Sequence, residues 1–280
     1  GFGLALGVAL ALAAPDREAM LDWLRRLRHP RALPPIPEAA WQATLARYAF
    51  LAERPAADVE RLRALTAQFL RDKQFHGAQG FVITDEVALA IAAQAVLPVL
   101  HLRGGLAWYD DFVGIVVHPS EVVAQRKVVD EASVVHEYEE VVAGEAMDHG
   151  PVMLSWQDVL ASGVTSEGGY NVVIHEFAHK IDMRGGDADG CPPLPPGFAG
   201  SRNAREARAA WLSALQPAYE AFREQTIMAE RFGAEPPWLD DYGATSIGEF
   251  FAVACEAYFV NRANFGRDFP GVLEPVSYTH

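Results

Sequence analysis

The sequence predicts an α+β fold, and three observations lead to that class. Apolar residues recur at helical spacing in several long segments. Runs of β-branched residues are short and few, at residues 75–83, 99–102, 112–118 and 151–156. Half of the 280 residues are apolar and 21% are charged, which is typical of a globular chain long enough to bury a substantial core.

Residues 1–37 are predicted to be a leader or tail, poorly ordered, ahead of the folded domain. Residues 1–14 are apolar throughout, a pattern typical of a signal-peptide core or a truncated membrane anchor. They fall short of the 18 or more residues that a spanning helix needs. Arginines and a proline-rich run in residues 25–37 favour a basic, semi-rigid tail. We therefore expect residues 38–280 to form a single domain.

The first part of this domain is predicted to be a scaffold. Apolar residues recur at helical spacing in residues 38–71, and Pro55 divides the segment into two helices. A short strand is predicted at residues 75–83. An alanine-rich helix follows at residues 85–97 and ends before Pro98, because the residue preceding a proline is disfavoured in a helix.

Short strands are predicted next, at residues 99–102 and 112–118, where β-branched residues gather. Residues 122–142 are charged and mixed, which indicates strand and loop. His136 lies there beside three glutamates, and these form an alternative metal cluster whose spacing fixes no common face. A strand at residues 151–156 completes a small mixed sheet.

The rest of the domain is organised around His-Glu-Phe-Ala-His at residues 175–179, which has the form H-E-x-x-H. On a helix, His175 and His179 lie one turn apart and can direct imidazole nitrogens to one point about 2.0–2.1 Å away, a zinc bond length. Glu176 is rotated by roughly 100° from His175. It is therefore a candidate to accept a proton from water at the metal.

The surroundings of the motif favour a metal over a chance match. Residues 172–181 are apolar nearly all round, which predicts a buried helix of about four turns between two glycine pairs. Two histidines and a glutamate are costly in such a helix unless a metal or hydrogen bonds satisfy them. Histidines that are satisfied by core hydrogen bonds alone are the alternative.

A catalytic zinc site usually has three protein ligands, so a third must be found. No histidine follows His179 at a suitable spacing, and a carboxylate is therefore expected. The helix predicted at residues 247–259 carries Glu249 and Glu256, which are seven residues apart and share nearly one face. Glu249 also fits a capping box with Ser246, in which it would only satisfy the start of the helix.

Three further segments surround the motif. The strand at residues 151–156 is the candidate for an edge strand that binds substrate backbone by β-addition, and an internal strand without substrate contact is the alternative. Residues 186–197 are predicted to be a loop, whose two aspartates lack the EF-hand calcium pattern. Residues 203–232 are predicted to be a helix that packs outside the metal core and is interrupted at Pro217.

Three motifs carry a family resemblance: His-Glu-Phe-Ala-His-Lys-Ile-Asp at residues 175–182, Asp-Tyr-Gly-Ala at 241–244 and Gly-Glu-Phe-Phe-Ala-Val at 248–253. Together they resemble the Mlc titration factor A family of zinc peptidases, which is similar in its metal core to lethal-factor-type toxin proteases. The resemblance runs from about residue 20 to about residue 273. The chain departs from the family pattern in a longer connection between the two metal helices and at both ends.

The resemblance implies an α+β, zincin-like metallopeptidase fold with an H-E-x-x-H active-site helix and one Zn²⁺ per chain. It implies His175, His179 and Glu249 as the metal ligands. It further implies Glu176 as the general base and Tyr242 as a hydrogen-bond donor to the transition state. The family also implies a protein partner, a glucose-responsive transcriptional repressor.

Two more carboxylates are candidates to orient a ligand histidine. Glu256 lies two turns after Glu249 on the same predicted helix, and Asp182 lies three residues after His179. An ion pair elsewhere is the alternative for Glu256.

The predicted function is hydrolysis of peptide bonds in a peptide or protein substrate, by an endopeptidase or an aminopeptidase. The alternative is a regulatory protein-binding module whose fold is stabilised by zinc. Because a pure binding module needs no general base, Glu176 favours the peptidase.

Charge and cysteine content narrow the partners and the compartment. A formal charge of −14 disfavours direct binding to nucleic acid, since phosphates would be repelled. Cys191 and Cys255 are too few for a disulfide scaffold, and both are expected to be free thiols, Cys255 buried in its helix. We therefore expect a cytoplasmic enzyme and no membrane role.

Overall fold

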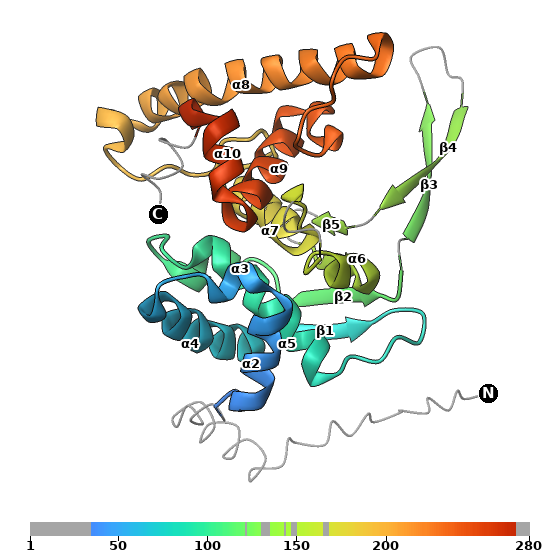
Figure 1. Ribbon diagram of the computed structural model, residues 1–280, viewed down its shortest axis with the longest axis vertical. Coiled ribbons are helices and arrows are strands. Elements are labelled where there is room, and N and C mark those ends of the chain that lie inside the picture. Colours follow the sequence, from blue (N-terminus) through green and yellow to red (C-terminus); the bar gives the residue numbers. More distant parts are fainter. Residues whose placement is uncertain are drawn as a thin grey trace, which may run out of the picture. The chain divides into compact units, whose positions relative to one another are not determined.

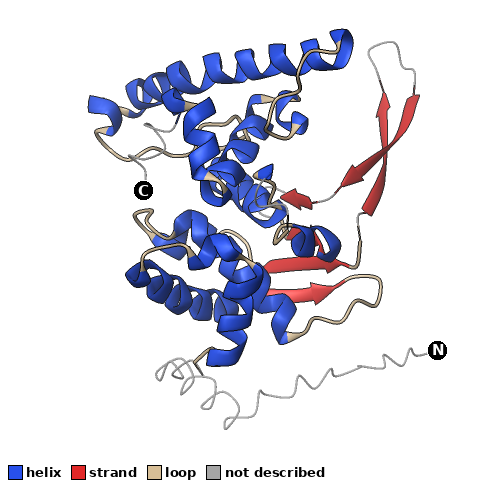
Figure 2. Cartoon of the chain, viewed as in Figure 1, coloured by secondary structure: helices blue, strands red, loops and turns tan. Residues whose placement is uncertain are grey.

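The computed structural model describes residues 35–120, 122–129, 135–142, 144–146, 150–164 and 168–272. The predicted leader or tail lies outside the described residues except for its last three. The unit that contains the fold begins at Ile36. Helices predominate over strands in it, as Figure 2 shows, and the class is α+β as predicted.

Most helices coincide with predicted periodic segments, but residues 38–72 form three helices rather than two, and the helices at residues 156–161 and 262–268 were not predicted (Figure 1). The helices are α2 Glu38–Arg47, α3 Ala49–Ala52, α4 Ala56–Asp72, α5 Asp85–Val96, α6 Trp156–Ala161, α7 Val172–Asp182, α8 Ala204–Phe232, α9 Ile247–Val260 and α10 Arg262–Asp268. Short 3₁₀ turns are η1 Leu97–Val99, η2 Gly105–Tyr109, η4 Met183–Gly185, η5 Phe198–Gly200 and η6 Asp241–Ala244. Pro55 precedes α4 and α5 ends before Pro98, both as predicted.

The strands form a small mixed sheet and a separate hairpin. They are β1 Gln74–Gly77, β2 Gly114–His118, β3 Val122–Val129, β4 Val135–Val142, β5 Gly144–Ala146 and β6 Val152–Ser155. The order in the sheet is β1-β2-β6-β5, in which β1, β2 and β6 are parallel and β5 is antiparallel to β6. Strands β3 and β4 pair antiparallel with each other.

The prediction of an edge strand at residues 151–156 is wrong. Strand β6 lies inside the sheet, between β2 on one side and β5 on the other. The outer position belongs to β5, whose three residues are too few to show an alternating pattern in the sequence. Residues 152–155 form an internal strand, which is the position that the alternative prediction gave them.

Other predicted elements differ in detail. Residues 99–102 are not a strand, because the chain turns from α5 into η1 with Pro98 in its first turn and Val99 fully buried. Strand β1 ends at Gly77, before a turn in which Gln79 and Gly80 have positive φ. Helix α8 continues through Pro217 without interruption, so one missing backbone hydrogen bond is tolerated in its 29 residues.

Two aromatic clusters fix the positions of the central helices. Phe177 of α7 packs against the rings of Phe69, Tyr109 and Phe112. Phe250 of α9 packs against Tyr219, Phe222 and Phe269, with 5.4–5.8 Å between the ring centroids. Each aromatic pair adds to the burial of apolar surface. Helices α7 and α9 thus lie against each other with rigid packing behind them (Figure 1).

The loop after α7 packs closely on the start of α9. A Cβ atom on Gly248 would lie 2.4 Å from the carbonyl oxygen of Ala188, and one on Gly190 would lie 2.9 Å from that of Ile247. Gly190 also has a φ of +76°, a conformation that side chains disfavour. The glycines therefore allow a backbone contact that sets where α9 begins.

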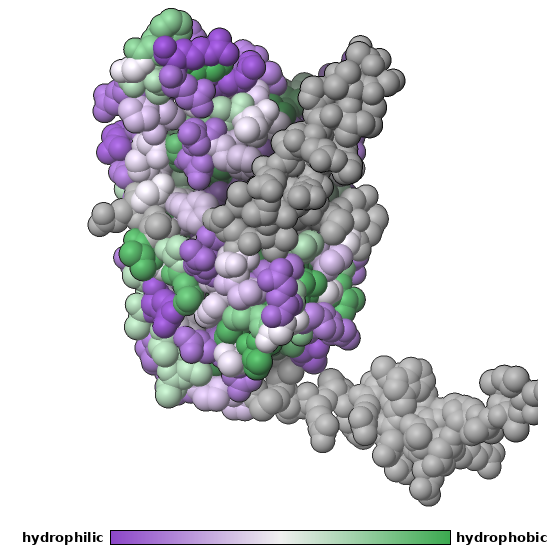
Figure 3. Space-filling model, turned by 90° about the vertical axis from the view of Figure 1, so that its right-hand side faces the viewer, coloured by the Kyte–Doolittle hydropathy of each residue, from purple (hydrophilic) through white to green (hydrophobic). Residues whose placement is uncertain are grey.

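The surface shows no concentration of large apolar side chains among the described residues. Those that are well exposed are Val82, Val113, Val164 and Tyr242, which lie in different segments, and Met228 and Phe232, which lie one turn apart on one helix. On the face drawn in Figure 3, hydrophilic and hydrophobic residues are interspersed. Of the described helices, none has the length and apolar character that a membrane span requires.

Candidate metal centre

The H-E-x-x-H motif lies on α7, whose start is held by Asn171. The Asn171 side chain accepts a hydrogen bond from the N–H of Ile174 at 2.9 Å, which is a helix N-cap. Its amide nitrogen also donates to Gln94 Oε1 of α5 at 2.8 Å, and its backbone N–H donates to Glu256 of α9. One buried residue thus ties α7 to both neighbouring helices. Helix α7 has 11 residues and is shorter than the four turns predicted.

His175, His179 and Glu249 come together at one point. The Nε2 atoms of the two histidines are 3.2 Å apart, and each lies 3.1 Å from Oε2 of Glu249. Ligand atoms that lie 2.0–2.1 Å from a tetrahedral zinc are roughly 3.3–3.4 Å from one another. The three atoms therefore form a nearly regular triangle of the size that such an ion needs, and two nitrogens with one carboxylate oxygen suit zinc chemically.

Glu249 contributes to both roles that its sequence position allows. Ser246 is the N-cap of α9, and its side chain accepts a hydrogen bond from the backbone N–H of Glu249 at 3.1 Å. The Glu249 carboxylate lies at the two histidines. Helix capping thus uses the backbone of Glu249 and leaves its carboxylate available to a metal.

Glu256 meets the other side of the His175 ring. Its Oε1 lies 2.7 Å from Nδ1 of His175, and its Oε2 accepts the hydrogen bond from Asn171. The Glu256 side chain is buried, so these contacts are not shared with bulk solvent. A carboxylate on Nδ1 favours the tautomer in which Nδ1 carries the proton and Nε2 presents its lone pair to a metal.

Electrostatic coupling within the cluster shifts three pKa values. Burial alone would lower the pKa of His175, but its contacts with Glu249 and Glu256 raise it well above the usual value. Burial would raise the pKa of Glu249, and the two histidines instead lower it to about 2. For Glu256, burial dominates and raises the pKa in spite of His175. Without a metal, the cluster therefore holds a proton on His175 that an ion would displace.

The two predicted catalytic residues lie near the triangle in different environments. Glu176 is buried on α7, immediately after His175. Tyr242 lies on η6 rather than in an irregular loop, and 48% of its surface is exposed. Its ring centroid is 6.1 Å from that of His175, with the rings inclined by 42°. Tyr242 therefore lies close to His175, one of the ligands that the family resemblance implies.

Asp182 contacts the loop after α7 rather than a ligand histidine. Its Oδ2 accepts a hydrogen bond from the N–H of Gly190 at 2.7 Å, whereas its Oδ1 and the Nδ1 of His179 have no hydrogen-bond partner in the described part of the chain. Burial raises the pKa of Asp182 to about 7, which the Gly190 N–H only partly offsets. Asp182 thus holds the loop that packs on the start of α9.

Other sequence-predicted groups fall outside this centre. The His136 cluster lies where side chains are outside the described residues. Cys191 and Cys255 are free thiols, and Cys255 is half-buried rather than fully buried as predicted. No pattern in the sequence indicates the roles of Asn171 and Gln94, because their contacts join residues 77 and 85 positions apart and leave no periodic signal.

Comparison with known proteins agrees with this arrangement. The family described as glucose-regulated metallo-peptidase M90 matches residues 21–278. An uncharacterised protein of Synechocystis sp. is 36% identical over 241 residues, which cover 85% of this chain and 81% of that protein. Mlc titration factor A of Cronobacter sakazakii is 33% identical over 256 residues, 91% of this chain and 89% of that protein.

A third relative extends the agreement. Mlc titration factor A of Edwardsiella ictaluri is 36% identical over 214 residues, 76% of each chain. A metallopeptidase family implies a metal cofactor, and the group of His175, His179 and Glu249 could hold one. The match over nearly the whole chain shows that it belongs to the glucose-regulated metallo-peptidase M90 family, the family of Mlc titration factor A.

Proposed function

We propose that this chain is a zinc-dependent peptidase whose catalytic domain comprises residues 38–280, with a zincin-like active site. His175, His179 and Glu249 bind one zinc ion, and Glu176 is the general base. The observation that carries the proposal is the triangle of ligand atoms with sides of 3.1–3.2 Å, beside which a buried glutamate follows directly on the same helix.

The proposed chemistry divides the reaction among the chain's own residues. A bound zinc ion would polarise the scissile carbonyl and lower the pKa of a water molecule. Glu176 takes the proton of that water and passes it to the leaving amine. Glu256 holds the His175 ring by its Nδ1, and Tyr242 donates a hydrogen bond to the oxygen on which negative charge develops.

We place the substrate along β5. This strand pairs with β6 on one side, contacts α7, and has no second partner among the described strands. An extended peptide can add to such an edge through backbone hydrogen bonds alone. Strand β5 thus takes the place of residues 151–156 as the proposed substrate strand, since both edges of β6 are already paired.

Two measurements on the purified full chain test the peptidase proposal. Elemental analysis should find one zinc per chain, and a peptide-library digest should show cleavage that a chelator removes and added zinc restores. The positions of the cuts would separate an endopeptidase from an aminopeptidase. Stoichiometric zinc without any cleavage would instead support a regulatory binding module.

The names of the relatives favour a second role that is compatible with the first. Several relatives are called Mlc titration factor A, which names a protein that titrates Mlc. We propose that this chain likewise binds a transcriptional repressor of the Mlc kind, as protein rather than through DNA. Its net charge of −14 and its free thiols fit this role in the cytoplasm. Co-purification of the Glu176→Gln chain with such a repressor, with and without operator DNA, is the test.

A further inference from the structure

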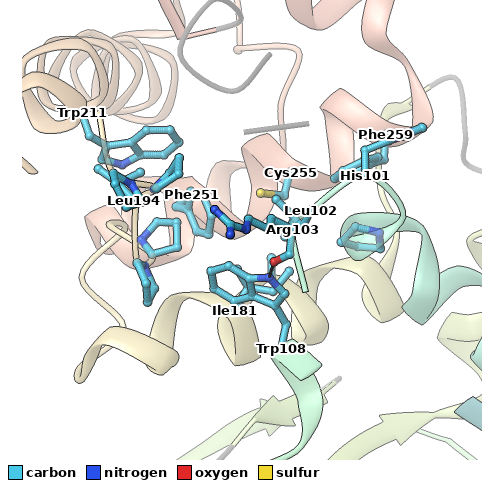
Figure 4. A pocket seen from close by; sticks show the side chains of 16 residues that line it. His101, Leu102, Arg103, Trp108, Ile181, Leu194, Trp211, Phe251, Cys255 and Phe259 are labelled. Carbon is cyan, nitrogen blue, oxygen red and sulfur yellow. Dashed lines mark hydrogen bonds between the residues drawn. The ribbon is translucent and has the colours of Figure 1, made fainter. Parts of the chain in front are cut away.

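A cavity of about 440 Å³ lies against the two helices that carry the proposed metal ligands (Figure 4). On α7 it is lined by Ala178 and Ile181, and on α9 by Phe251 and Cys255. None of the residues proposed to bind metal or catalyse lines this cavity. It is therefore separate from the metal centre.

The wall of the cavity is apolar and largely rigid. Opposite the two helices lie Trp108, Trp211 and the loop of residues 192–196, in which four of the five residues are prolines. Prolines restrict the backbone, so this wall is formed before any ligand arrives. The volume of the cavity falls within the range of about 300–1,000 Å³ that is typical of sites for small molecules. The size and the lining together suit a compact apolar ligand.

One charged group distinguishes the cavity from a void in the core. Arg103 lines it and is exposed to solvent, and in Figure 4 its guanidinium lies among the lining side chains. The Trp108 ring nitrogen donates to the Arg103 carbonyl oxygen at 3.0 Å, which fixes the backbone of this turn. Arg103 makes no ion pair with any other described residue, whereas the neighbouring His101 is engaged by Asp58 at 3.1 Å.

We propose that this cavity binds a small apolar carboxylic acid, with its hydrocarbon or aromatic body between the two tryptophans and its carboxylate on Arg103. A guanidinium binds a carboxylate through two parallel hydrogen bonds and is the cation best suited to it. In a chain with a charge of −14, an anion is repelled from most of the surface. An arginine that has no ion-pair partner among the described residues and lies over an apolar cavity therefore selects for a ligand with one acidic end.

The test is calorimetric titration of the full chain with octanoate, compared with octanol as the uncharged ligand of equal chain length. We expect octanoate to bind at one site. Arg103→Gln should weaken octanoate at least about 10-fold, because a charge-assisted hydrogen bond is lost, and should change octanol binding by less than about 2-fold. Arg223→Gln, which removes an exposed arginine of α8 outside the cavity, is the matched control.

Filling the cavity gives a second, independent measurement. Cys255→Phe places a larger side chain in the cavity from α9. If that variant does not fold, Leu194→Trp places a larger side chain there from the loop of residues 192–196. Either should abolish binding of both ligands. The proposal is overturned if octanoate does not bind the unaltered chain, if Arg103→Gln binds it as tightly, or if a folded filling variant retains it. The titration requires neither metal nor hydrolysis, so its outcome is independent of the function proposed above.

Discussion

Oε1 of Glu256 lies 2.7 Å from Nδ1 of His175, while Oε2 of Glu249 lies 3.1 Å from Nε2 of the same ring. Two carboxylates of one helix, seven residues apart, therefore hold the two nitrogens of one imidazole on α7. The Glu256 contact is buried, and its second oxygen accepts the N–H of Asn171 at the start of α7. We infer that Glu249 binds the metal and that Glu256 orients the ring that binds it.

The first prediction separates these two glutamates. Glu249→Ala should lose zinc, because it removes a ligand. Glu256→Ala should weaken zinc binding by about 10–100-fold, because the His175 ring loses the partner that fixes its tautomer and position. Competition with a chelator of known affinity measures both, and Glu224→Ala, at an exposed position of α8, is the control. If Glu256→Ala emptied the site and Glu249→Ala did not, Glu249 would be only a helix-capping residue.

The second prediction concerns Glu176. Glu176→Gln should keep one zinc per chain and abolish hydrolysis, because the amide preserves the shape of the side chain but cannot accept the proton. Elemental analysis and a peptide assay on the same preparation provide the measurements. His175→Ala is the comparison, since it should lose both zinc and activity. Equal loss of zinc from the two variants would show that Glu176 is a ligand or a structural residue instead.

The third prediction concerns the protonation of the metal-free cluster. Glu249 and Glu256 raise the pKa of His175 well above its usual value, so at neutral pH this ring carries a proton that zinc must displace. Zinc affinity should therefore fall as the pH is lowered. Calorimetry in buffers with different enthalpies of ionisation counts the protons released on binding. Release of no proton between pH 6 and 7 would mean that His175 is already neutral in the metal-free chain.

The fold was predictable where a local pattern exists. The periodic spacing of apolar residues and the positions of Pro55 and Pro98 gave most of the helices to within a few residues, but not the short helices α3, α6 and α10. The strand order was not predictable, because β5 has three residues and its pairing with β6 depends on contacts rather than on a pattern. Helix α8 passes through Pro217 because packing of its long apolar face outweighs one local penalty.

The residues of the candidate site were likewise predictable only where a local pattern exists. His175 and His179 follow from their spacing on one helix, and the structure brings them within 3.2 Å of each other. Choosing Glu249 over Glu256 needed the family resemblance, because both lie on one face of α9. The link from Asn171 to Glu256 spans 85 residues and has no signature in the sequence, since only the packing of α7 on α9 brings the two together.

The fourth prediction uses the buried Asp182. Its pKa is about 7 in the folded chain, against about 3.9 when unfolded, so the folded state binds the proton more tightly. Stability due to this group is present below about pH 4 and is lost as the pH rises through about 7, by up to roughly 4 kcal/mol. In the metal-free chain, Asp182→Asn should therefore gain stability relative to the unaltered protein between pH 4 and 7.

Denaturant unfolding of the metal-free protein across that pH range measures this difference. Asp187→Asn, in the same loop but at an exposed position, is the control for adding an amide. A constant difference in free energy of unfolding between Asp182→Asn and the unaltered chain would show that Asp182 does not titrate there. The Gly190 N–H contact would then keep its carboxylate ionised throughout.

The last prediction concerns Tyr242, which lies in the segment between the two metal helices and has its ring close to His175 of the first. Turn η6 is held by the Asp240 side chain, which accepts from the N–H of Tyr242 at 2.9 Å, and it leads into α9 through the Ser246 cap. The Tyr242 ring lies 6.1 Å from that of His175 and remains 48% exposed. The side chain thus lies beside the metal ligands without being buried among them, as suits a group that meets the substrate.

A phenol hydroxyl can donate a hydrogen bond to an oxygen that gains negative charge as water attacks. Tyr242→Phe should therefore keep zinc and fold, but lose roughly 100–1000-fold in turnover with little change in KM, because the bond forms only in the transition state. Steady-state kinetics on a good peptide substrate measures this. Tyr219→Phe is the control, because its hydroxyl donates to the Ala244 carbonyl of η6 at 3.3 Å and its ring packs against Phe250. Near-normal turnover in Tyr242→Phe would reduce Tyr242 to packing against His175.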